Sequence, residues 1–145
     1  MKKIFVIALS FVLVLGIFSC RKKGELPPGA KLEPELIKDT TEIAFIDSST
    51  FVFDTINEGD KVQHSFRIKN VGNKSLFIAN AFGSCGCTVP EYPKDVVKPG
   101  DIATIKVTFN SAGKKDEQNK TVTLVCNTLK RNEMLYLKGF VKTTE

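Results

Sequence analysis

The sequence contains no tryptophan, one histidine and two methionines. It also lacks the short motifs of several enzyme classes: there is no GxSxG nucleophile elbow, no HExxH zinc motif and no glycine-rich loop for phosphates or dinucleotides. Its aspartates and glutamates are scattered, without a pair placed to share acid–base chemistry. We therefore predict that the chain is not an enzyme, and we identify no cofactor and no small-molecule substrate.

The sequence also lacks a large excess of charge of one sign. The formal net charge is +5, and without Lys2 and Lys3 the chain has 19 basic and 16 acidic residues. These charges are spread along the sequence, whereas nucleic-acid-binding domains gather basic residues into patches or stripes. We predict no nucleic-acid partner.

The N-terminal segment is the one long hydrophobic run. Lys2 and Lys3 precede an apolar run from Ile4 to Phe18 that fits the hydrophobic region of a signal peptide and is short for a membrane-spanning helix of about 20 residues. The run ends in Ile17-Phe18-Ser19-Cys20, which resembles a bacterial lipoprotein cleavage box, although Phe18 stands where a small residue is usual. We expect residues 1–19 to be a lipoprotein signal peptide and Cys20 to be the lipidated, palmitate-bearing N-terminus; simple secretion and a retained signal anchor are the alternatives.

Residues 20–41 differ in composition from the rest of the chain. They hold Pro27, Pro28, Pro34 and many charges, with too little apolar surface to offset the entropy of ordering the chain. We expect them to form a flexible linker, with residues 42–145 as the folded domain. The basic tract Arg21-Lys22-Lys23 lies beside the anchor and reads as part of a solvated tether that faces the periplasm.

The remainder of the chain has the pattern of an all-β domain. Short segments alternate apolar and polar residues and are separated by turn signals such as residues 70–75 and 98–101. About seven short strands in about 100 residues is typical of an immunoglobulin-like β-sandwich. We expect strands at 43–46 and 51–53 (one strand broken at 47–49), 61–69, 76–82, 102–109, 120–126 and 134–141, and a loop containing Pro90 and Pro93.

Several spaced motifs resemble one bacterial family. The domain-of-unknown-function 1573 family is marked by a Ser-Cys-Gly-Cys-Thr run, here Ser84 to Thr88, and the resemblance covers about Phe51 to Val141. It implies an immunoglobulin-like fold similar to major sperm protein and to domains of ciliary proteins, which are binding modules, and members are commonly exported proteins or lipoproteins. The supporting residues are Asp54, Glu58-Gly59, Asn70-Val71-Gly72 and Pro99-Gly100.

Three of the four cysteines lie in this domain. Cys85 and Cys87 follow the strand at 76–82, whereas Cys126 ends a strand that runs in the opposite direction in this kind of sandwich. A strand of that length separates the two ends by roughly 20 Å, and bridged cysteines need Cα atoms within about 7 Å. We expect Cys126 to be free, buried and inert, since it shares a face with Val122 and Leu124.

Three roles remain open for Cys85 and Cys87. In the first, the pair, bridged or reduced, orders the turn after its strand. In the second, it exchanges with other thiols, and Gly86 allows the backbone to bend. In the third, it binds copper or zinc together with His64; this speculative set has soft ligands and is one ligand short of a closed zinc site. We name no catalytic residue and no established metal ligand.

The sequence thus predicts an exported lipoprotein with one immunoglobulin-like domain. We expect it to be anchored in the cell envelope, at the outer membrane facing the periplasm, and to act as a non-catalytic binding or scaffold module with a protein partner. A thiol-redox or copper- and zinc-handling protein that uses Cys85 and Cys87 is the alternative from a different class.

Overall fold

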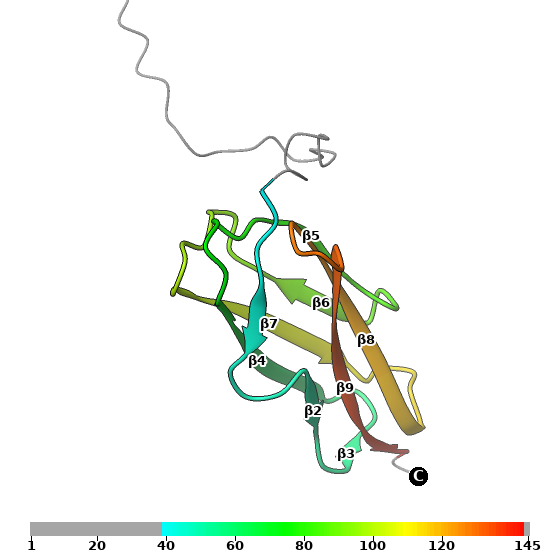
Figure 1. Ribbon diagram of the computed structural model, residues 1–145. Helices are drawn as coiled ribbons and strands as arrows, with labels where there is room; N and C mark the ends of the chain where they lie inside the picture. The colour runs from blue at the N-terminus through cyan, green and yellow to red at the C-terminus, as the bar shows by residue number, and fades with distance from the viewer. Residues whose placement is uncertain (1–38, 144–145) are drawn as a thin grey trace, which may run out of the picture.

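The computed structural model describes residues 39–143, which form two packed β-sheets (Figure 1). The four-stranded sheet has the order β1-β4-β7-β6, and the five-stranded sheet has the order β2-β9-β8-β5, with β3 also paired to β9. In these residues no helix is long and apolar enough to cross a membrane. The strands are β1 (Ile43–Phe45), β2 (Thr50–Val52), β3 (Ile56–Asn57), β4 (Lys61–Asn70), β5 (Ile78–Gly83), β6 (Thr88–Glu91), β7 (Ile102–Asn110), β8 (Asp116–Cys126) and β9 (Asn132–Lys142).

The long strands bury every second residue, as their sequence alternation predicts. Because successive side chains of a strand point to opposite faces, one set from each sheet meets in the core. On β4 the inward set becomes more buried from Val62 to Ile68, and on β7 and β8 it is almost fully buried. The predicted inward residues with exposed fractions of 3% or less are Phe66, Ile68, Ala103, Ile105, Val107, Phe109, Val122, Leu124 and Cys126.

The first predicted strand is broken where the sequence indicates, and its two halves join different sheets. β1 pairs antiparallel with β4, whereas β2 pairs parallel with β9. Asp47 lies in the connection between them and forms an ion pair with Arg67 of β4, with Nη2 to Oδ1 at 2.7 Å and Nε to Oδ2 at 3.0 Å. This N-terminal segment therefore connects the two layers along one edge of the sandwich.

Several sequence-based boundaries are wrong: β3 was not predicted, and β8 begins at Asp116, four residues before the predicted start at 120. Residues 88–91, expected in a loop because of Pro90, form β6 at the edge of the four-stranded sheet; an edge strand tolerates proline because one side of it has no ladder to complete. Ile78, not Leu76, begins β5, and Leu76 instead forms an isolated bridge with Val97.

The domain also begins before the predicted boundary at residue 42. Thr41 is 3% exposed, its N–H donates to the carbonyl of Asn127 (3.0 Å), and its hydroxyl donates to Oδ1 of Asn70 (2.8 Å). The predicted signal peptide, lipidated Cys20 and most of the linker lie outside the described residues. The chain enters the sandwich at one end, and β9 finishes at the other, beside β3 (Figure 1).

Candidate functional site

The Ser-Cys-Gly-Cys-Thr run forms the connection from β5 to β6. β5 is the edge strand of the five-stranded sheet and β6 is the edge strand of the four-stranded sheet. The run therefore crosses from one layer to the other, at the end of the sandwich where β5 finishes. The sequence-based prediction that Cys85 and Cys87 follow the end of this strand is therefore confirmed.

Backbone hydrogen bonds fix the connection to both sheets. The Ser84 N–H donates to the carbonyl of Thr121 on β8 (2.7 Å), and the Thr121 N–H donates to the Ser84 hydroxyl oxygen (3.2 Å). On the other side, the Asn110 N–H at the end of β7 donates to the carbonyl of Cys87 (2.9 Å). The turn between these points closes with a bond from the Thr88 N–H to the Cys85 carbonyl (3.1 Å).

Cys85 and Cys87 are joined by a disulfide, with Cα atoms 5.2 Å apart. Both residues are half-buried, and Cys87 packs against the hydrophobic core. The Thr88 hydroxyl oxygen lies 3.6 Å from the Cys85 sulfur and 3.9 Å from the Cys87 sulfur. Thr88 itself is only 2% exposed, so a buried hydroxyl faces both sulfurs.

The glycine that the turn requires is Gly83, not Gly86. A Cβ on Gly83 would collide with the backbone carbonyl oxygen and the Cβ of Thr88, because the end of β5 passes close to the start of β6. A Cβ on Gly86 would meet no atom within 4 Å, and the φ of Gly86 is not in the left-handed range. The expectation that Gly86 allows the backbone to bend is therefore wrong.

Cys126 is at the opposite end of β5, as expected. It pairs with Ile78, whereas Gly83 at the other end of β5 pairs with Val122. Cys126 is free and 1% exposed, and burial, with a smaller effect of the Glu133 charge, raises the pKa of its thiol to about 12. Since the thiolate is the reactive form, this thiol is inert in the folded domain.

His64 is not placed beside the cysteines. In the four-stranded sheet it lies opposite Val107, which lies opposite Pro90 in turn, so β7 separates it from β6. Its ring stacks on Phe51 (centroids 3.8 Å apart) and meets Phe66 edge-on (4.6 Å). Burial lowers the pKa of His64, which favours the neutral ring, while the Asp47 charge opposes this shift.

The fold therefore does not bring His64, Cys85 and Cys87 together as the metal hypothesis requires. Residues 39–143 contain no group of three or more His, Cys, Asp or Glu side chains placed to hold a metal ion. The sulfurs of Cys85 and Cys87 are bonded to each other, and a bridged pair offers no thiolate as a ligand.

Lys120 is a neighbour of the site that sequence reasoning missed. It precedes Thr121, the partner of Ser84, and it lies on the inward side of β8 with Val122 two residues away. Its ammonium lies 5.7 Å from the ring centroid of Phe109, the residue that pairs with Thr88. Burial, followed by the Lys114 charge, lowers the pKa of Lys120. The alternation of side chains along β8 could have identified Lys120, because it puts position 120 on the core-facing side.

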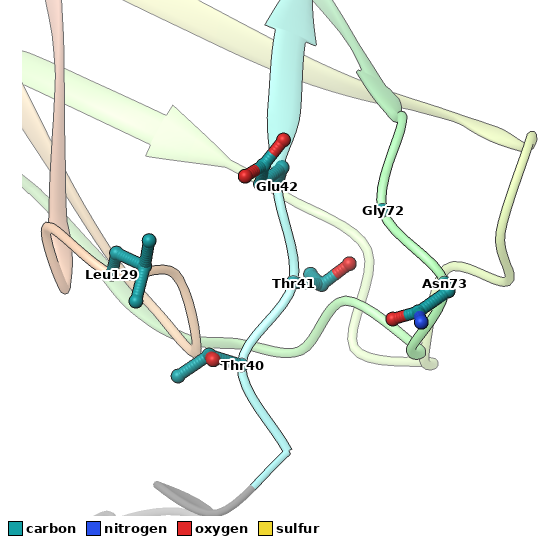
Figure 2. A pocket seen from close by; sticks show the side chains of 6 residues that line it. All are labelled: Thr40, Thr41, Glu42, Gly72, Asn73 and Leu129. Carbon is teal, nitrogen blue, oxygen red and sulfur yellow. The ribbon is translucent and has the colours of Figure 1, made fainter.

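A pocket of about 280 Å³ lies at the other end of the sandwich, where the chain enters β1 (Figure 2). Of its lining residues only Glu42 carries a titratable side chain, so it offers no set of converging acid and base groups. The lining residues are Thr40, Thr41, Glu42, Gly72, Asn73 and Leu129, from the entering segment and the two neighbouring turns.

Solved structures support the fold and no more than the fold, since identities are low. A protein of unknown function from Porphyromonas gingivalis W83 matches with a TM-score of 0.61 and 14% identity over 70% of this chain, which spans only 47% of that chain. The PapD-like domain 7 of human CEP192 matches with a TM-score of 0.58 and 12% identity, covering 85% of this chain and 97% of that domain. The secreted serine protease VesC from Vibrio cholerae matches with a TM-score of 0.53 and 11% identity, over 68% of this chain and 23% of that chain.

These similarities confirm the predicted immunoglobulin-like β-sandwich. No curated protein matches the chain. A family described as "Protein of unknown function (DUF1573)" matches residues 44–141, nearly the whole sandwich, and that description is consistent with a non-catalytic domain. The match extends over more than half of the sequence and includes the disulfide turn, and the chain therefore belongs to the DUF1573 family.

Proposed function

We propose that the chain is an exported lipoprotein whose β-sandwich is a non-catalytic binding module of the cell envelope. In this proposal a lipid on Cys20 holds the protein at the outer membrane, and the linker lets the domain reach a protein partner in the periplasm. The Cys85–Cys87 disulfide supports export, because disulfides persist in oxidising compartments and are rare in the cytosol.

The observation that carries the binding role is a pair of exposed apolar side chains that flank the disulfide turn, one on the outer face of each sheet. Phe82, near the end of β5, is 49% exposed, and Val89, in β6, is 55% exposed. They lie on either side of a turn that hydrogen bonds fix to both sheets. Large apolar side chains held on a rigid, exposed element are what a partner can bury on binding.

Both edge strands at this site are poor templates for adding a strand from another chain. Pro90 removes a backbone donor from β6, and the pairing of β5 shifts register between Ile78 and Asn80. Proline and bulges are two ways in which proteins protect sheet edges. We therefore expect the partner to bind through side-chain contacts with Phe82 and Val89, not through a shared ladder of backbone hydrogen bonds.

Site-specific photo-crosslinking in the native membrane tests this role. A photoreactive residue at position 82 or 89 should give the same discrete adduct with one envelope protein. Positions 140 and 52 are matched controls, because Phe140 (44%) and Val52 (69%) are also exposed but lie away from the turn. Equal adducts at all four positions, or none at 82 and 89, would argue against a binding site here.

A separate experiment tests the anchor. Cells expressing the full chain should incorporate labelled palmitate into the protein, and Cys20→Ser should abolish the label and release the protein from the membrane fraction. The matched control is Cys126→Ala, which should leave both the label and the membrane fraction unchanged. Persistence of the label in Cys20→Ser would contradict lipidation at this residue.

A further inference from the structure

The disulfide between Cys85 and Cys87 is open to reagents. Gly86 is exposed, and apart from Cys85 and Cys87 themselves no atom lies within 4 Å of the position where a Cβ would stand. Of the two cysteines, Cys87 packs against the core, whereas Cys85 does not belong to that cluster. A thiol from outside the chain therefore has its clearest approach to Cys85.

The surrounding turn does not depend on the disulfide alone. Bonds from Ser84 to Thr121 and from Asn110 to Cys87 hold the run to β8 and β7, and they involve no sulfur atom. Opening the disulfide therefore leaves both cysteines tied to the sandwich and close to each other. Reversible exchange requires this, because the second thiol must stay in reach of the first.

Thr88 is placed to stabilise a thiolate. Its hydroxyl is buried, and in residues 39–143 its hydrogen-bond partners are the two sulfurs, at 3.6 and 3.9 Å. Sulfur in a disulfide is a weak acceptor, whereas a thiolate accepts a much stronger, charge-assisted bond. A valine would pack equally well in the bridged state, so the hydroxyl gains its importance when the bond opens.

Lys120 adds a positive charge at the same end of the sandwich. Its ammonium lies 5.7 Å from the ring centroid of Phe109, the residue opposite Thr88, and Lys120 adjoins the residue that bonds Ser84. A nearby cation favours the thiolate form of a cysteine and so speeds exchange. Thr88 and Lys120 are positioning residues of the exchange site proposed below.

From these contacts we propose that Cys85 and Cys87 form a thiol–disulfide exchange site that accepts two electrons from thiols outside this chain. An incoming thiolate bonds to the Cys85 sulfur, the disulfide breaks, and Cys87 leaves as a thiolate facing Thr88. A second external thiolate then attacks the external sulfur of the mixed disulfide and releases Cys85. Two external thiols are oxidised to a disulfide and release two protons to the solvent, and Cys85 and Cys87 take up two protons from the solvent and end as the dithiol. This activity goes beyond the proposed binding role and does not depend on it.

Equilibration of the purified full chain in glutathione redox buffers tests the exchange. Alkylation followed by peptide mass spectrometry reports residues 85 and 87 separately from the other cysteines. The pair should pass between bridged and dithiol forms as the buffer is made more reducing, while circular dichroism shows a folded domain throughout. A pair that stays bridged until the domain unfolds would overturn the proposal.

Variants test the assigned roles. In Cys87→Ser the Cys85 thiol should react with an aromatic disulfide reagent several-fold faster than the Cys87 thiol does in Cys85→Ser; equal rates would refute attack at Cys85. Thr88→Val should slow reduction by glutathione about tenfold, as expected for loss of a hydrogen bond to a charged group, and Thr88→Ser should restore the rate.

Matched controls separate these effects from changes in folding. Thr104→Val, on exposed β7 surface, should leave the rate unchanged. Lys120→Met should slow reduction several-fold and weaken its salt dependence, whereas Lys69→Met, at the other end of the sandwich, should not. Exchange that is unaffected by both Thr88→Val and Lys120→Met would show that the site does not assist it.

Discussion

At the scale of single residues, the two glycines near the cysteines have different roles. The sequence draws attention to Gly86, because it separates the thiols, yet in the fold Gly86 has open space around it. Gly83 is restricted instead by Thr88, which follows it by only five positions but belongs to the other sheet. Such close approach between layers is visible only once the turn has folded.

We predict that Gly83→Ala destabilises the domain and that Gly86→Ala does not. The added methyl group at position 83 would collide with the Thr88 backbone, and overpacking of this kind costs about 2 kcal/mol of unfolding free energy. At position 86 the methyl group meets nothing and restricts the unfolded chain, so a gain of up to about 1 kcal/mol is expected. Urea unfolding of both variants measures the difference, and equal midpoints would contradict the close approach.

His64 makes the stability of the domain depend on pH. Burial lowers its pKa in the folded state below the ordinary value of 6.5, so near and below pH 6.5 the unfolded chain binds more protons than the folded one. Stability should therefore fall as pH drops through about 6.5 and level off below the folded pKa. The lowered pKa of Asp47 acts in a separate window, below its ordinary value of 3.8.

Unfolding of the native chain and of His64→Phe at about pH 7.5 and about pH 5 checks this dependence. The phenylalanine ring keeps the stacking on Phe51 without a titrating group. The native chain should lose more stability on acidification than the variant. An identical loss in both would show that another group is responsible.

At the scale of elements, Asn70 joins the segment before β1 to two neighbouring connections, at the end of the sandwich where the chain enters. Its side chain is fully buried. The amide nitrogen donates to the carbonyls of Lys74 (2.7 Å) and Val97 (2.9 Å). The amide oxygen accepts from the Thr41 hydroxyl (2.8 Å) and from the Gly72 N–H (3.2 Å). The Asn70-Val71-Gly72 run, which the sequence shows only as a turn signal, is thus a structural junction.

We predict that Asn70→Ala lowers the free energy of unfolding by about 3 kcal/mol, because it leaves several buried groups without partners. Denaturant unfolding measures the loss. Asn73→Ala, an exposed change three residues away, should stay within about 0.5 kcal/mol of the native chain. Similar values for the two variants would rule out the junction.

The strands differ in how well the sequence predicts them. β7 and β8 alternate regularly, and their apolar inward residues were correctly identified, whereas the polar inward residues Gln118 and Lys120 of β8 were missed. β6 was missed because Pro90 reads as a loop signal, and only its place at a sheet edge makes proline acceptable there. His64 lies at the expected end of β4, but the strand order inserts β7 between it and the cysteines.

At the scale of the whole molecule, the entering segment belongs to the domain. Thr41 bonds Asn127 and Asn70, and the side-chain amide of Asn127 donates to the carbonyls of Asp39 (2.8 Å) and Ser75 (2.9 Å). These contacts connect the segment before β1 to both neighbouring turns.

A chain that begins at residue 42 should therefore be less stable than one that begins at residue 39. We expect a loss of about 2 kcal/mol, from the bonds of Thr41 and Asp39 to the turns. Thr41→Val in the longer chain should show only part of this loss, because it keeps the backbone bond to Asn127. Thermal and urea unfolding compare the three, and equal stability would restore the boundary at residue 42.

The sequence by itself determined the fold class, the inward faces of the long strands and the isolation of Cys126. These properties follow from local alternation, because period-two patterning decides which side chains a strand can bury. The tertiary structure alone decided that β5 and β6 are edges of different sheets, that a buried Thr88 hydroxyl faces both sulfurs, and that Lys120 lies near Phe109, the partner of Thr88. Those facts depend on strand order and on contacts between layers, which no local pattern encodes.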